Sequence, residues 1–131
     1  MALSLHEANR VIAATIAKAK EINIRVCVAV CDEGGRLMAF QRMDHAIWAA
    51  VYGSQGKAIA SAAFGRASGD LTARADHPTP RGIREASGGH MIMGQGAVPL
   101  LRDGLVVGAV GVGGGTAQED EDCAKAGAAA L

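Results

Sequence analysis

Two cationic residues near an aspartate could together bind an anion. Arg42 and Asp44 directly follow the end of a predicted strand, where side chains can point into a crevice, and Lys57 lies in the next predicted helix. An arginine offers a rigid fork for a carboxylate and a lysine adds a point charge, so Arg42 and Lys57 are candidate ligands for a small anionic molecule. The alternative is a surface or interface ion pair between Arg42 and Asp44, with Lys57 solvated.

His90 is a candidate general acid or base, because histidine titrates near neutral pH. In an enzyme, His90 or Asp44 would move a proton while the two cations fix the substrate. The alternative is a hydrogen-bonded loop histidine, which is the more common role of a lone histidine. Met91 and Met93 follow with the alternation of a strand, and we expect them to fill the core.

A run of glycines lies between a predicted strand and the last predicted helix, an arrangement that often indicates nucleotide binding. Here Gly111-Val112-Gly113-Gly114-Gly115-Thr116 has threonine where the dinucleotide pattern needs its third glycine. The helix also begins with four acids, at positions 119–122, which compete with a phosphate for the positive end of the helix dipole. The run therefore predicts close packing of the backbone against the sheet or a ligand.

Nucleophilic catalysis and a structural metal site find little support. The sequence Gly53-Ser54-Gln55-Gly56 is not the Gly-x-Ser-x-Gly elbow of hydrolases. Cys27 and Cys31 fall in one predicted strand, too far apart to bond together, and are expected to be buried, reduced thiols. Cys123 with four scattered histidines does not offer zinc ligands at usable spacing.

Composition excludes several classes of partner. The 131 residues fit one domain, 1–131, with 13 basic and 13 acidic residues and no long block of either sign. Aromatic residues make up 3 %, which leaves few platforms for stacking nucleic-acid bases. No apolar run approaches the length of a membrane span, and the first residues lack the pattern of a signal peptide. We expect a cytoplasmic protein that binds neither nucleic acid nor membrane.

Patterning predicts an α+β domain. Ser4 and Glu7 form a capping box before a helix that should run to about Ile22. The remaining predicted elements are strands at 26–31 and 37–40, a helix at 47–64, a short helix at 68–74, an irregular connection at 76–96, two strands joined by a turn at 102–104, and a helix at 117–131. Adjacent strands with short turns pair antiparallel, so helices should pack on an antiparallel sheet.

Several motifs in this order resemble the GlcG/HbpS-like family, which includes the haem-binding C-terminal domain of PduO and was formerly a domain of unknown function. They are Val28-Ala29-Val30-Cys31-Asp32-Glu33-Gly34-Gly35-Arg36-Leu37, Gln41-Arg42-Met43-Asp44, Lys57-Ala58-Ile59-Ala60, Phe64-Gly65-Arg66 and Val106-Val107-Gly108-Ala109-Val110-Gly111-Val112-Gly113-Gly114. The resemblance covers nearly the whole chain. It implies a profilin-like α/β sandwich around a five-stranded antiparallel sheet, assembled as a homo-oligomer.

The resemblance also bears on ligands. Some members bind haem, among them an extracellular protein and a domain fused to a corrinoid adenosyltransferase, while others occur among enzymes of glycolate or aromatic breakdown. The family's glycine-rich approach to a Val-Pro strand is kept at Gly94-Gln95-Gly96-Ala97-Val98-Pro99, with His90 just before it. His90 thereby becomes a candidate haem ligand.

These observations lead to one preferred hypothesis. The protein is expected to be a cytoplasmic, homo-oligomeric binding protein for haem or a small anionic catabolite, held between the sheet and the 76–96 connection. Backbone N–H groups near Gly94 and Gly96, with Arg42 and Lys57, would bind the polar end of the ligand, and Val98 would line the apolar part. The alternatives are an acid/base enzyme acting on a small carboxylate or aromatic catabolite, and an accessory protein that only builds an oligomer.

Overall fold

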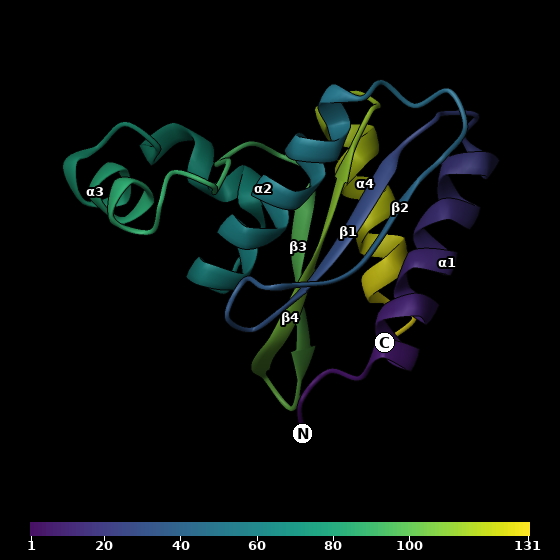
Figure 1. The fold of residues 1–131 in the computed structure, drawn as a ribbon, viewed down its shortest axis with the longest axis horizontal. Helices are drawn as coiled ribbons and strands as arrows, with labels where there is room; N and C mark the ends of the chain where they lie inside the picture. Colours follow the sequence, from purple (N-terminus) through teal and green to yellow (C-terminus); the bar gives the residue numbers. More distant parts are fainter.

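The computed structural model describes residues 1–131 and shows an α+β fold in which helices cover both faces of one antiparallel sheet (Figure 1). The chain order is α1 (Leu5–Glu21), β1 (Cys27–Asp32), β2 (Leu37–Arg42), α2 (Ala49–Phe64), the 3-10 helix η1 (Ser68–Arg74), α3 (Pro78–Ala86), β3 (Ala97–Arg102), β4 (Leu105–Gly113) and α4 (Ala117–Ala128). None of these helices is long and apolar enough to cross a bilayer.

The sheet has four strands in the order β2-β1-β4-β3, so the expectation of five strands was wrong. The alternating segment around Met91 and Met93 could have supplied another strand. Instead the Ile92 N–H donates to the Gly56 carbonyl of α2 at 2.9 Å. Both methionines are buried in a small cluster that includes Ala60 of α2. The core-filling role predicted for the two methionines is confirmed.

Helix α1 begins where the sequence predicts. The Ser4 side chain accepts the Glu7 N–H and the Glu7 carboxylate accepts the Ser4 N–H, which completes the capping box. Its apolar stripe, with Val11 and Ile12 fully buried, packs with α4 on one face of the sheet (Figure 1). This face holds the main core of branched aliphatic side chains, including Val28 and Val30 of β1.

Helix α2 covers the opposite face, which is lined by small residues (Figure 1). Ala29 and Cys31 of β1 point to this side and meet Ala58. A Cβ at Gly111 would overlap the Ser54 carbonyl of α2, and one at Gly113 would press on Ala50 at 3.2 Å. The prediction that the glycine run serves close packing is therefore confirmed for these two positions.

The connection between η1 and β3 differs from the expectation. Residues 76–96 were predicted to be irregular, but they contain α3, which has a proline at its first position. Proline fits the first turn of a helix because the N–H it lacks has no partner there. No residue of α3 is buried, and the helix projects away from the sheet (Figure 1).

Helix α4 begins with a second capping box. The Thr116 hydroxyl accepts the Glu119 N–H and the Glu119 carboxylate accepts the Thr116 N–H, while Asp120 accepts the Gly115 N–H at 2.8 Å. The Glu119 N–H is thus engaged by the cap, and the carboxylates of Glu119 and Asp120 lie in the first turn of the helix. Acidic side chains at the start of this helix were the feature of the sequence that disfavoured a phosphate site.

Candidate functional site

The predicted site residues do not converge on one place. They divide among a buried ion pair, the interior of the sheet, the end of β2, and a set of hollows on the outer side of α2. No cavity contains both His90 and either of the cations Arg42 and Lys57.

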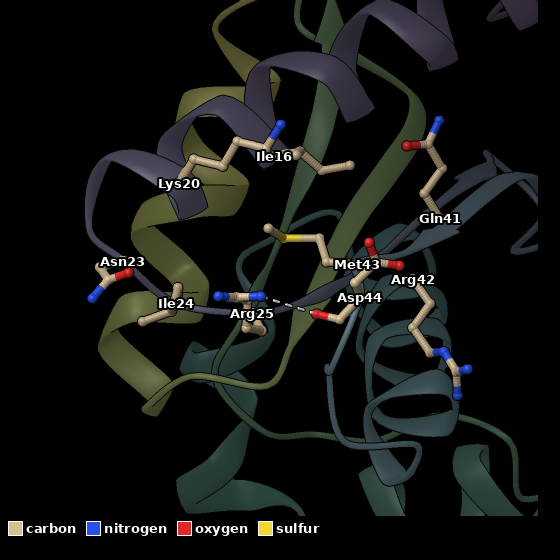
Figure 2. Close-up of a pocket in the computed structure, with 9 residues that line it drawn as sticks. All are labelled: Ile16, Lys20, Asn23, Ile24, Arg25, Gln41, Arg42, Met43 and Asp44. Carbon is tan, nitrogen blue, oxygen red and sulfur yellow. Dashed lines mark hydrogen bonds between the residues drawn. The ribbon is translucent and has the colours of Figure 1, made fainter.

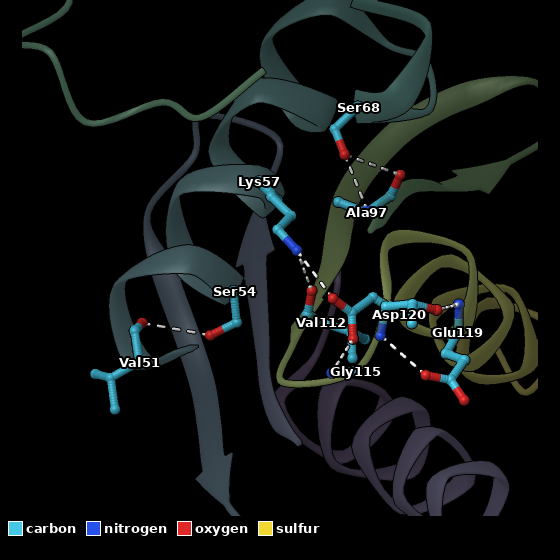
Figure 3. A network of polar contacts seen from close by, with 10 residues as sticks. Val51, Ser54, Lys57, Ser68, Ala97, Val112, Gly115, Glu119 and Asp120 are labelled. Atoms are coloured by element: carbon cyan, nitrogen blue, oxygen red, sulfur yellow. Dashed lines mark hydrogen bonds and ion pairs between the residues drawn. The ribbon is translucent and has the colours of Figure 1, made fainter. Parts of the chain in front are cut away.

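Lys57 is buried in a structural ion pair (Figure 3). Its ammonium donates to the Asp120 carboxylate at 3.2 Å and to the Val112 carbonyl at 2.8 Å, and the two side chains are 13 % and 4 % exposed. Burial raises the pKa of Asp120, although the Gly115 N–H and Lys57 both act to lower it. The contact joins α2 to β4 and α4, so Lys57 is neither solvated nor available at a cavity wall.

Gly96 and Val98 belong to the interior. Gly96 is buried with φ +142°, its carbonyl accepts the Val112 N–H at 3.0 Å, and a Cβ there would lie 2.7 Å from the Lys57 ammonium. Val98 packs in the main core on the α1/α4 face. Gly94 is half-buried and, like the other two, lines none of the cavities.

Arg42 and Asp44 lie near a cavity at the end of β2 (Figure 2). Arg42 pairs in register with Cys27, so its side chain shares the α2 face of the sheet, and Figure 2 shows its guanidinium pointing away from Gln41 and Lys20. Asp44 is exposed, and its carbonyl accepts a hydrogen bond from Arg25 at 3.4 Å. Arg42 and Asp44 form no ion pair with each other within this chain.

His90 lies between two adjoining hollows on the outer side of α2. One, of about 390 Å³, is lined by the β1–β2 turn, Ile59 and Met91. The other, of about 430 Å³, is lined by Tyr52, Ile59 and Ile92. The imidazole is exposed and accessible from both.

Two glycines hold the His90 segment in this position. The segment passes so close over α2 that a Cβ at Gly56 would lie 2.6 Å from the Ile92 side chain and 2.9 Å from the His90 carbonyl. Gly88 has φ +98°, and a Cβ there would lie 3.1 Å from the imidazole. Gly56 therefore has a packing function, since glycine in a helix interior is otherwise unfavourable by about 1 kcal/mol.

Apolar side chains surround His90 on this face, and sequence analysis missed their role. Ile59 lines both hollows and a third, smaller one of about 150 Å³, while Ile92 and Tyr52 are 41 % and 68 % exposed. The available signal was the seven-residue spacing of Tyr52 and Ile59, which places two large side chains on one outward stripe of an alanine-rich helix.

The third hollow also reaches Cys31, but the thiol offers no chemistry. Its sulfur lies 3.5 Å from the Ala58 carbonyl, and burial raises the pKa of Cys31 to about 12. A thiol that stays protonated is neither a nucleophile nor a metal ligand. The predicted inert, buried cysteines are confirmed.

The fold and these hollows define an α+β domain with an apolar, histidine-bearing surface site. Residues 3–129 match the family model described as haem degrading protein HbpS-like, and the chain belongs to that family. The family resemblance predicted from the sequence is confirmed.

Named relatives agree with this assignment. Protein GlcG of Escherichia coli K12 is 38 % identical over 111 residues, which are 84 % of this chain and 80 % of that protein. Corrinoid adenosyltransferase PduO of Citrobacter freundii is 26 % identical over 132 residues, but the chain spans 39 % of its length. The crystal structure of a PduOC:Heme complex superimposes with a TM-score of 0.88 at 26 % identity, covering 100 % of this chain and 96 % of that one.

Proposed function

We propose that this protein binds haem in the hollows around Ile59, with His90 as the residue that would hold the iron. The observation that carries the proposal is the placement of an exposed imidazole between two hollows that share the Ile59 side chain. Neutral imidazole is a common haem ligand, and apolar walls with few polar groups suit a porphyrin. The PduOC:Heme complex supports the proposal, because a relative of the same fold is a haem complex.

The chain's own residues would bind and orient the group, and the iron would supply the redox chemistry. A role for Arg42 at a haem propionate is left out of the proposal, because Arg42 lines a cavity that contains neither His90 nor Ile59. Lys57 has no such role in the proposal, because Asp120 and Val112 already occupy its ammonium. Gly94, Gly96 and Val98 are likewise left out of the proposed site.

Titration with haemin tests the proposal. Wild-type protein should give a saturable Soret shift, and His90→Ala should weaken binding by at least roughly tenfold, the equivalent of about 1.4 kcal/mol. His6→Ala, His45→Ala and His77→Ala are matched controls, because these histidines are exposed and lie outside the hollows. Unsaturable binding would remove haem from the account, and equal loss in a control variant would place the iron elsewhere.

Haem degradation is a second candidate, favoured by the description of the family model. Adding ascorbate to the haem complex in air and following the Soret band would detect it. Loss of the band in wild type, but not in His90→Ala at matched haem occupancy, would support degradation at this site. The acid/base enzyme acting on a small carboxylate has less support, because no cavity combines His90 with Arg42 or Lys57.

Self-association is part of the proposal. Ile47 and Trp48, just before α2, and Tyr52, near its start, are large exposed apolar residues, and Trp48 is 70 % exposed. Clustered exposed apolar residues favour association because burying them removes apolar surface from water. Native mass spectrometry should show a homo-oligomer that Trp48→Ser disrupts, and cell fractionation would test the proposed cytoplasmic location.

A further inference from the structure

A separate cavity of about 480 Å³ lies between the end of α1, the loop after it and the end of β2 (Figure 2). Its volume is within the range of small-molecule sites. It shares no residue with the hollows around His90. A ligand here would therefore be bound independently of haem.

Three cations line this cavity without a carboxylate partner: Lys20, Arg25 and Arg42. Lys20 and Arg25 form no ion pair, whereas the neighbouring Lys18 is paired with Glu21 at 3.5 Å. Arg25 is held only by its bond to the Asp44 carbonyl. The Arg42 guanidinium points away from Lys20 and Arg25 (Figure 2). Against the two remaining positive charges the cavity wall carries one carboxylate, that of Asp44, so a ligand with one negative charge would be favoured.

The end of α1 adds little opposing potential. The last carbonyls of a helix repel anions when they are free. Here the Ile22 N–H donates to the Lys18 carbonyl, the Asn23 N–H to the Lys20 carbonyl and the Ile24 N–H to the Ala19 carbonyl. These bonds occupy three of the last carbonyls of the helix.

The rest of the wall is apolar and fixed by the core. Ile16, Ile24 and Met43 are half-buried and pack against the main aliphatic cluster. The Met43 sulfur also accepts the Val26 N–H at 3.4 Å. In Figure 2 the Met43 thioether is seen between the side chains of Lys20 and Arg25, so apolar and cationic contacts are offered side by side.

We propose that this cavity is a binding site for a small monocarboxylate with an apolar body. Lys20 and Arg25 would bind the carboxylate, and Met43 with the two isoleucines would contact the hydrocarbon. Inorganic phosphate satisfies only the first of these requirements, and an uncharged alcohol satisfies only the second. The site should accordingly prefer a carboxylate to both.

The test uses benzoate, with benzyl alcohol and inorganic phosphate as matched probes, in the absence of haem. Backbone amide chemical shifts of the full chain should change saturably with benzoate at residues 20–25 and 41–44. The double variant Lys20→Gln/Arg25→Gln should raise the dissociation constant at least roughly tenfold, since hydrogen bonds to charged groups contribute about 1.5–3 kcal/mol. Both side chains are exposed, so the variant should fold.

Lys18→Gln is the control, because Lys18 is on the same helix but does not line the cavity. It should leave benzoate binding unchanged. The proposal would be overturned by absence of saturable binding, by shifts confined to other residues, by equal loss in Lys18→Gln, or by benzyl alcohol or phosphate binding as tightly as benzoate.

Discussion

The two faces of the sheet are packed in opposite ways. The α1/α4 face is filled by branched side chains such as Ile12, Val28 and Val110, all fully buried. The α2 face is filled by backbone and small side chains, with Gly111 directly against α2. The α1/α4 face should therefore be sensitive to loss of side-chain volume, and the α2 face to added volume. Helix α2 also carries the proposed haem site on its outer side.

Removing volume from the α1/α4 face should have the largest effect. Ile12→Ala leaves a cavity in the main core, and we expect a loss of about 2–5 kcal/mol in unfolding free energy. Urea denaturation followed by circular dichroism would measure it. A loss below about 1 kcal/mol would mean that neighbouring side chains fill the space left by Ile12. The α1/α4 face would then not be sensitive to loss of volume, contrary to the expected contrast between the two faces.

Adding volume to the α2 face should be the next largest effect. In Gly111→Ala the new Cβ would meet the Ser54 carbonyl and the Ala58 nitrogen, so we expect a loss of about 1–3 kcal/mol. Gly53→Ala is the matched control, because nothing lies within 4 Å of its Cβ position. Alanine should stabilise the helix there by about 0.5–1 kcal/mol. Two substitutions of the same sign would contradict the packing described for this face.

Gly56→Ala should change haem affinity much more than it changes the stability of the fold. The new methyl group would displace Ile92 and the His90 carbonyl, while the helix gains propensity, so stability should change by less than about 1 kcal/mol. Haem affinity should nevertheless fall roughly tenfold. Haemin titration beside Gly53→Ala measures the difference, and equal affinities in the two variants would show that the close approach at Gly56 does not position the site.

The smallest effect concerns acid stability at the edge of the α1/α4 face. Hydrogen bonds from the Ser4 backbone and from Arg102 lower the pKa of Glu7 from 4.5 to about 2. A lowered pKa in the folded state gives stability that is present above pH 4.5 and is lost as the pH falls toward 2. Denaturation midpoints across this range should fall less steeply in Glu7→Gln than in wild type. Glu21→Gln, which alters an exposed pair on the same helix, should retain the wild-type slope.

Much of the fold was predictable because local signals were strong. The Ser4–Glu7 capping box fixed the start of α1, and short turns between apolar runs predicted antiparallel pairing. The α3 helix was missed because its two prolines look like helix breakers unless their place in the first turn is known. The fifth strand, which the family resemblance implied, is absent, and the strand-like alternation at 91–93 packs against α2 and joins no sheet ladder.

The site was less predictable, because it depends on contacts between distant parts of the chain. Lys57 looked like a free cation, and only the fold places Asp120, 63 residues away, against it. The hollows around His90 arise where its segment crosses α2 at Gly56, which no sequence spacing reveals. Arg42 and His90 were identified as candidates from residue type alone, and their roles stay predictions.

The most direct test is a crystal structure of the protein crystallised with haemin. We expect the iron to be bonded to an imidazole nitrogen of His90 and the porphyrin to contact Ile59 and Ile92. Iron bonded to His6, His45 or His77, or a porphyrin seated on the α1/α4 side of the sheet, would contradict it.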